Sequence, residues 1–145
     1  MPYLRITSPE LPDADRRVIA ARLTDAVIDL WYQRRAPVTR DELRERTTVH
    51  FTPYAADELF IGGRSTNERG ATDVSVELSD WSMSVRHQRR AARTLTPLLC
   101  ELFRATPSDV NLRFHSYPPT DFAVAGMLLS QRIPWIGRVM KSLFD

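Results

Sequence analysis

The chain has 145 residues, of which 43% are hydrophobic and 26% charged, and its formal net charge at pH 7 is +2. This length is enough to bury a substantial core, so we expect one domain over residues 1–145 rather than a fibrous or disordered protein. The single cysteine excludes a disulfide framework, and no apolar run approaches the roughly 18 residues of a membrane-spanning helix, so we expect a cytoplasmic protein.

A proline directly follows the initiator methionine. Removal of Met1, which requires a small second residue, would leave Pro2 with a secondary amine that can act as a base or a nucleophile. Residues 2–7 alternate apolar and polar side chains, which is typical of a strand with one buried face. Because proline is also tolerated as the first residue of a strand, Pro2 alone is weak evidence for a reactive group.

The next segment has the spacing of an amphipathic helix. Its apolar residues share one face that we expect to lie on a sheet, and they are Ile19, Leu23, Ala26, Val27 and Leu30. Residues 39–46 then form an insertion in which Thr39 and Glu42 can make a capping box, so a short helical turn is predicted there.

The second half of the chain repeats the pattern of the first. One constant offset relates two expected strands and the tyrosine after each, so that Val49-His50-Phe51 and Tyr54 correspond to Leu112-Arg113-Phe114 and Tyr117. A second helix is expected around Leu95, and residues 72–77 alternate in the same way as residues 2–7. We therefore predict two βαβ units, the first at 2–63 and the second at 72–130.

The second helix contains Pro97. A proline inside a helix removes one backbone hydrogen bond and clashes with the preceding turn, at a cost of about 3 kcal/mol. We therefore expect either a kink or a new helix that starts with Thr96 as N-cap. After Pro134, residues 134–145 place apolar side chains on one stripe, which predicts a short C-terminal helix that packs on its own or a neighbouring subunit, or alternatively on a membrane surface.

These elements predict an α+β fold. The duplicated βαβ units would form a four-stranded sheet with two helices on one face, plus the short C-terminal helix. The second face of such a sheet is uncovered, and an apolar second face needs another layer. We expect oligomerisation to supply that layer.

Four features in combination resemble the tautomerase superfamily. They are Pro2 at the start of the first strand, Val49-His50-Phe51, Leu59-Phe60-Ile61-Gly62-Gly63 at the end of unit one, and Gly126 in unit two. The two-unit length is similar to the migration inhibitory factor and cis-3-chloroacrylic acid dehalogenase branches. The resemblance implies a homotrimer whose sheets enclose a barrel, with active sites between subunits. It also implies an enzyme without cofactor or metal, in which Pro2 moves a proton within a small 2-oxo or enol carboxylic acid.

The resemblance also indicates which residues would surround the amine of Pro2. A base that works near neutral pH needs a lowered pKa, which apolar neighbours and nearby cations provide. Tyr3, Leu4 and the turn at Ile61 are the candidates for the apolar wall. Asn111 stands where the inhibitory factor branch has a tyrosine, which leaves the group that polarises the carbonyl unassigned.

A planar arginine suits the carboxylate of a 2-oxo acid. The first candidate is Arg113, which the resemblance places in the active site of the neighbouring subunit, although a cross-strand ion pair is the alternative role. Arg34 and Arg35 are the next candidates, because they precede a proline much as a substrate-binding lysine does in the inhibitory factor branch.

Other positions depart from the dehalogenase branch. Asp80 and Met83 stand where that branch has two arginines, and Val124 stands where it has a water-activating glutamate, so hydrolytic dehalogenation is not expected. The alternative to an enzyme is a non-catalytic homologue or an interaction module with the same fold. Retention of Met1 would favour this alternative, because an acylated nitrogen in Pro2 is not basic.

The remaining chemistry-bearing residues suggest no further partner. The histidines, His50, His87 and His115, lack ligand spacing, so we expect no metal site. We expect Cys100 to be buried and inert. The arginines near the second helix are expected to form a solvated face rather than a nucleic-acid contact, because no aromatic platform interleaves with them; they are Arg86, Arg89, Arg90 and Arg93.

Overall fold

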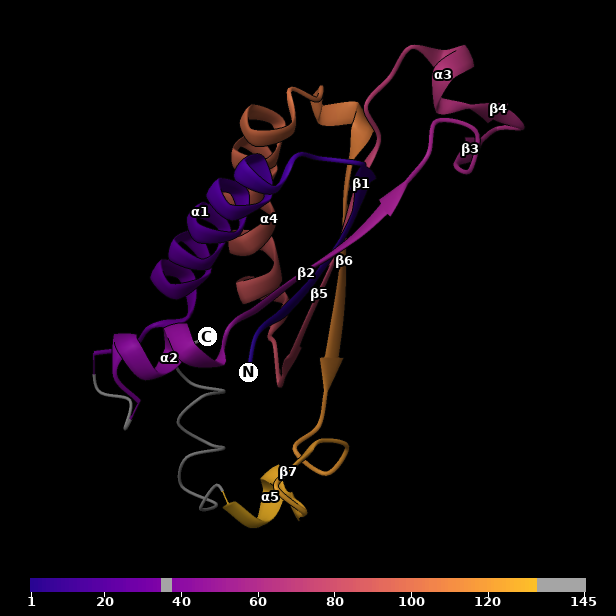
Figure 1. Cartoon of the computed structure of the whole chain (residues 1–145). Coiled ribbons are helices and arrows are strands. Elements are labelled where there is room, and N and C mark those ends of the chain that lie inside the picture. The colour runs from indigo at the N-terminus through magenta and orange to yellow at the C-terminus, as the bar shows by residue number, and fades with distance from the viewer. Residues whose placement is uncertain (35–37, 133–145) are drawn as a thin grey trace.

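The computed structural model describes residues 1–34 and 38–132, and a four-stranded sheet lies at its centre (Figure 1). The strand order is β2-β1-β5-β6. β1 runs parallel to β2 and antiparallel to β5, and β5 runs parallel to β6. The strands are β1 (Tyr3–Pro9), β2 (Thr48–Tyr54), β5 (Val74–Trp81) and β6 (Val110–Tyr117). The predicted α+β fold of duplicated βαβ units is confirmed.

Two long helices, α1 (Asp13–Trp31) and α4 (Val85–Phe103), cover the same face of the sheet (Figure 1). The predicted stripe of α1 is buried at Ile19, Leu23, Val27 and Leu30, while Ala26 is half-buried. These side chains pack with alternate residues of the two central strands, such as Leu4 and Val76, to form one core. Burial of such aliphatic side chains contributes about 1.5–3 kcal/mol each and is the main force that joins helices to sheet.

The second helix differs from its prediction at Pro97. α4 is one continuous helix across Pro97, and its N-cap is Ser84, whose side chain accepts a hydrogen bond from the backbone N–H of His87. A new start at Thr96 is therefore wrong. The buried residues recur every four positions, at His87, Ala91, Leu95, Leu99 and Phe103, and this apolar face keeps the helix intact on the sheet despite the missing amide of Pro97.

Short elements lie at the ends of the sheet. The insertion forms α2 (Arg40–Arg46), and Thr39 and Glu42 make the predicted capping box. A hairpin follows each unit: the first contains β3 (Phe60–Ile61), β4 (Arg64–Ser65) and α3 (Thr66–Arg69), and the second contains β7 (Ala123–Val124), β8 (Met127–Leu128) and α5 (Leu129–Arg132). A 3₁₀ turn at Pro107–Asp109 precedes β6. Figure 1 shows the two hairpins at opposite ends of the sheet.

The face of the sheet away from the helices is polar. In β1 its side chains are Tyr3, Arg5 and Thr7, and Arg5 makes an ion pair with Glu77 of β5 at 3.7 Å. The expectation of an apolar second face is therefore wrong. Exposed large apolar side chains occur on the hairpins, at Phe60, Ile61, Met127 and Leu128, and on the two long helices, at Val18 and Val85.

Among the described residues, no helix is long and apolar enough to cross a membrane. The predicted C-terminal helix at 134–145 falls outside the described residues, as does Arg35.

Candidate active site

Pro2 lies at the end of the sheet where β1 begins. Its side chain is fully buried, and its carbonyl oxygen accepts a hydrogen bond of 3.0 Å from the backbone N–H of Thr48. The antiparallel register of β1 and β5 pairs Tyr3 with Ser79 and Leu4 with Leu78. One step further along, Pro2 stands opposite Asp80, and both side chains are on the face that the helices cover.

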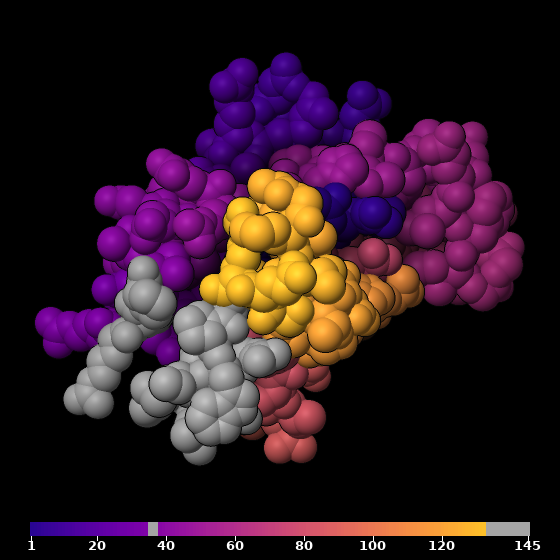
Figure 2. Space-filling view, turned by 90° about the horizontal axis from the view of Figure 1, so that it is seen from below, coloured from indigo at the N-terminus to yellow at the C-terminus, as the bar shows by residue number. Residues whose placement is uncertain are grey.

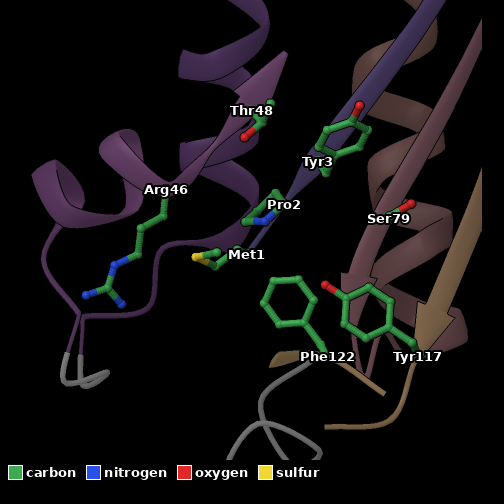
Figure 3. A pocket seen from close by; sticks show the side chains of 8 residues that line it. All are labelled: Met1, Pro2, Tyr3, Arg46, Thr48, Ser79, Tyr117 and Phe122. Atoms are coloured by element: carbon green, nitrogen blue, oxygen red, sulfur yellow. The ribbon is translucent and has the colours of Figure 1, made fainter. Parts of the chain in front are cut away.

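A pocket of about 220 Å³ adjoins this chain end (Figure 3). Tyr117, the last residue of β6, and Phe122, in the loop after it, supply aromatic walls with ring centroids 5.5 Å apart. Figure 2 views this end of the molecule from below and shows indigo atoms of the N-terminal residues beside the orange and yellow segment that follows β6. The pocket is lined by Met1, Pro2, Tyr3, Arg46, Thr48, Ser79, Tyr117 and Phe122.

A buried carboxylate lies next to the pocket. Asp80 is 1% exposed, and its Oδ1 is 2.5 Å from the ammonium nitrogen of Met1. Its Oδ2 accepts a hydrogen bond of 2.7 Å from the indole Nε1 of Trp31, the last residue of α1. The ring of Trp31 is in turn edge-on to the ring of His87, with centroids 4.1 Å apart. The amino terminus, β5, α1 and α4 therefore meet around one carboxylate.

The same buried carboxylate also affects the phenol of Tyr117. Burial of its phenol, and to a lesser extent the negative charge of Asp80, raises the pKa of Tyr117 to about 12. The hydroxyl is therefore neutral at physiological pH and can donate a hydrogen bond to a ligand in the pocket.

The other residues predicted for the site do not join Pro2 within one chain. Arg113 and Asn111 lie on β6, paired with Glu77 and Ser75 on the polar face, and the pocket lies beyond the C-terminal end of that strand. Ile61 belongs to the hairpin at the opposite end of the sheet (Figure 1). Arg34 is exposed just after α1. The roles that the resemblance gives these residues, some of them from a neighbouring subunit, stay predictions.

Sequence reasoning missed Arg46, Tyr117 and Phe122 as pocket residues. Arg46 ends α2 two residues before β2, and its side chain lines the pocket although its guanidinium points away from Pro2 in Figure 3. The internal repeat could have indicated Tyr117, because it matches Tyr117 to Tyr54. The parallel register places Tyr117 beside the end of β5, near Pro2. Phe122 lies in an irregular loop and had no comparable signal.

A second pocket, of about 290 Å³, lies at the opposite end of the sheet. Tyr54 there takes the place that Tyr117 has in the first pocket, and its hydroxyl donates a hydrogen bond of 2.7 Å to the carbonyl of Asp73. Pro9 and Thr72 also line it. Within 1–34 and 38–132, no group of three or more histidine, cysteine, aspartate or glutamate side chains is placed to hold a metal ion.

Neither a protein-family model nor a curated protein matches the sequence. Among solved structures, the chain is similar to a native fused 4-OT, with a TM-score of 0.75 and 21% identity over 89% of this chain and 97% of that one. It is also similar to Pt0534 inactivated by 2-oxo-3-pentynoate, with a TM-score of 0.74 and 17% identity over 91% of this chain and 99% of that one.

A third similar structure is N1, a member of the cis-3-chloroacrylic acid dehalogenase family. Its TM-score is 0.67 and its identity 18%, over 98% of this chain and 99% of that one. Likeness at this level of identity concerns the fold. The chain therefore has the same fold as the fused 4-OT, Pt0534 and N1.

Proposed function

We propose that this chain is a cofactor-free tautomerase that acts on a small 2-oxo or enol carboxylic acid through the amine of Pro2. The observation that carries the proposal is the position of Pro2 beside an aromatic-walled pocket, at the end of the sheet where the chain begins. Removal of Met1 would turn the nitrogen of Pro2 into a secondary amine and would vacate the part of the pocket wall that Met1 now forms.

The chemistry required of Pro2 is a proton shuttle. A secondary amine in its neutral form takes a proton from an enol oxygen or a carbon, and in its cationic form returns the proton to another carbon of the same substrate. The pocket volume of about 220 Å³ suits a small organic acid rather than a polymer. The neutral hydroxyl of Tyr117 is a candidate for polarising the substrate carbonyl.

Two arginines are candidates for binding the substrate carboxylate. Arg46 lines the pocket in the same chain. Arg113 would have to come from a neighbouring subunit, as the resemblance implies, and one similar fused 4-OT is described as a symmetric trimer. We propose the same assembly for this chain, with the exposed apolar side chains of the hairpins, among them Ile61 and Met127, in the contacts between subunits.

The test combines labelling with kinetics. Pt0534 is described as inactivated by 2-oxo-3-pentynoate, so we expect this 2-oxo acid to add to Pro2 of the processed chain, detected by intact-mass and peptide spectrometry. Ketonisation of phenylenolpyruvate or 2-hydroxymuconate is then measured on unlabelled protein. We expect Arg113→Ala to raise KM more than it lowers kcat, because it removes a contact to the carboxylate. The proposal would be overturned if the protein without Met1 showed neither labelling nor turnover.

The second candidate function is a non-catalytic binding protein with this fold. The ion pair between the ammonium of Met1 and Asp80 favours it, because a retained Met1 keeps the nitrogen of Pro2 in a peptide bond. Intact mass of the protein purified from its native source separates the two candidates. The mass of the chain without Met1 supports the enzyme, and the full mass supports the binding protein.

A further inference from the structure

We infer that Asp80 is the residue that binds the terminal amine of this chain, first the ammonium of Met1 and, after Met1 is removed, the protonated nitrogen of Pro2. The inference deepens the proposed function and rests on it only in taking Pro2 as the processed terminus. It makes Asp80 a positioning residue, which acts on substrate through Pro2.

The geometry of the strands supports this assignment. Residues opposite each other in an antiparallel pair have Cβ atoms about 4.5–5.5 Å apart. Pro2 stands opposite Asp80 one step beyond the pair Tyr3 and Ser79, with both side chains on the buried face. When Met1 is removed, the new terminal nitrogen is therefore directly across from the carboxylate that Met1 contacted at 2.5 Å.

The surroundings hold Asp80 in place for this role. The indole N–H of Trp31 donates to one carboxylate oxygen, and the ammonium of Met1 donates to the other at 2.5 Å. Trp31 is itself held at the end of α1, where the guanidinium of Arg90 from α4 donates to the carbonyl of the preceding Leu30. The carboxylate is thus oriented by a side chain from a different layer of the fold.

Several charged or titratable groups face this region from the surrounding elements. Arg46 of α2 is a cation but is exposed, so solvent screens it. Tyr117 of β6 has a neutral phenol. On α4, His87 contacts the ring of Trp31 and Arg90 donates to the carbonyl of Leu30. Asp80 is the buried charge across from Pro2, so its influence on the amine outweighs that of Arg46.

The consequence is a terminal amine that holds its proton. An opposite charge within about 4–6 Å shifts a pKa by roughly 1–3 pH units toward the charged form. The apolar wall of the pocket would act in the other direction, as expected for a base. We expect the carboxylate to dominate, so that Pro2 is a cation near neutral pH and turnover that needs its neutral form rises toward alkaline pH.

The test is direct ¹⁵N NMR titration of the Pro2 nitrogen, in ¹⁵N-proline-labelled protein from which methionine aminopeptidase has removed Met1. In the folded wild-type protein we expect a pKa at least about one pH unit above that of the same nitrogen in urea-unfolded protein. This comparison needs no variant. A folded value equal to or below the unfolded value would overturn the inference.

Variants identify the carboxylate. Asp80→Asn should lower the folded pKa of Pro2 by about one pH unit and move the ascending limb of the kcat/KM profile to lower pH, and Asp80→Glu should restore both. Glu77→Gln is the matched control, because it removes a carboxylate from the same strand on the opposite face. An Asp80→Asn titration that matches wild type would contradict the assignment. If the pKa of Pro2 is high but the protein shows no turnover, the role of Asp80 stands and the tautomerase proposal is rejected. If the pKa of Pro2 is low and the protein shows turnover, the tautomerase proposal stands and the role of Asp80 is rejected.

Discussion

The two ends of the sheet are related by the internal repeat, yet they carry different chemistry. Each end has a pocket, of about 220 and 290 Å³, beside a tyrosine that ends a parallel strand and before a two-stranded hairpin. Burial raises the pKa of both tyrosines, Tyr54 and Tyr117. Tyr3 pairs with Thr48 as Ser75 pairs with Asn111, so the position that corresponds to Pro2 is Val74, which is fully buried. Thr72 lines the second pocket.

The two ends differ in whether the backbone nitrogen at this position can become a terminal amine. Val74 is inside the chain, so its nitrogen is an amide, whereas the nitrogen of Pro2 would become an amine if Met1 were removed. Each end also contains a buried carboxylate with a cation. Asp73 is paired with the guanidinium of Arg69, and Asp80 with the ammonium of Met1. Duplication therefore yields two similar pockets, and under the proposed function the one beside Pro2 would carry the chemistry.

The sharpest way to test this contrast is a pair of substitutions, one at each pocket. We expect Pro2→Ala to lower kcat/KM for ketonisation of phenylenolpyruvate about 100-fold or more, because general acid–base groups contribute about 10²–10⁴-fold. Thr72→Ala should leave the rate within about twofold. Equal effects of the two substitutions would contradict the assignment of chemistry to one end.

The second expected effect concerns stability at the opposite end. Arg69 is 18% exposed and Asp73 5%, and Arg69 also approaches Asp109 at 3.9 Å. Arg69→Ala would leave the buried carboxylate of Asp73 without its cation, and the free energy of unfolding should fall by about 3 kcal/mol. Urea unfolding followed by circular dichroism measures this. Arg22→Ala, which breaks an exposed pair with Glu101, is the control and should leave stability nearly unchanged.

The smallest expected effect is a loss of stability at alkaline pH. The pKa of Tyr117 is about 12 in the folded chain against about 10 when unfolded, so the unfolded state loses its proton first as pH rises. The free energy of unfolding should therefore fall between about pH 10 and 12. Tyr117→Phe should reduce this fall, and the raised pKa of Tyr54 should account for part of what remains. A pH dependence identical to wild type would rule out Tyr117 as a source.

Local periodicity was sufficient to predict the main elements from sequence. Alternation in residues 2–7 and the stripe at Leu23 and Leu30 appear in the structure as β1 and the buried face of α1. The predicted new helix start beside Pro97 was wrong. Local propensity favours a break there, but packing of the α4 face on the sheet keeps one helix. The polarity of the outer sheet face was also missed, since the sequence argument did not sort the strand residues by face.

The site was less predictable because its walls come from separate loops. Pro2 could be selected from its position alone, but Arg46 and Phe122 reach the pocket through connections whose course periodicity does not determine. Asp80 was noticed as a departure from the dehalogenase branch, yet its partners are distant in sequence. Only the register of β1 on β5 brings it opposite Pro2.

The contact between Met1 and Asp80 has a practical consequence for recombinant production. An affinity tag fused ahead of Met1 replaces the ammonium with a neutral amide, and the buried carboxylate of Asp80 then loses a full positive charge at 2.5 Å. A protease that leaves even one residue ahead of Pro2 would also keep its nitrogen acylated. A purification handle ahead of Met1 should therefore be avoided, and a cleavable leader is acceptable only if cleavage is flush with the proline.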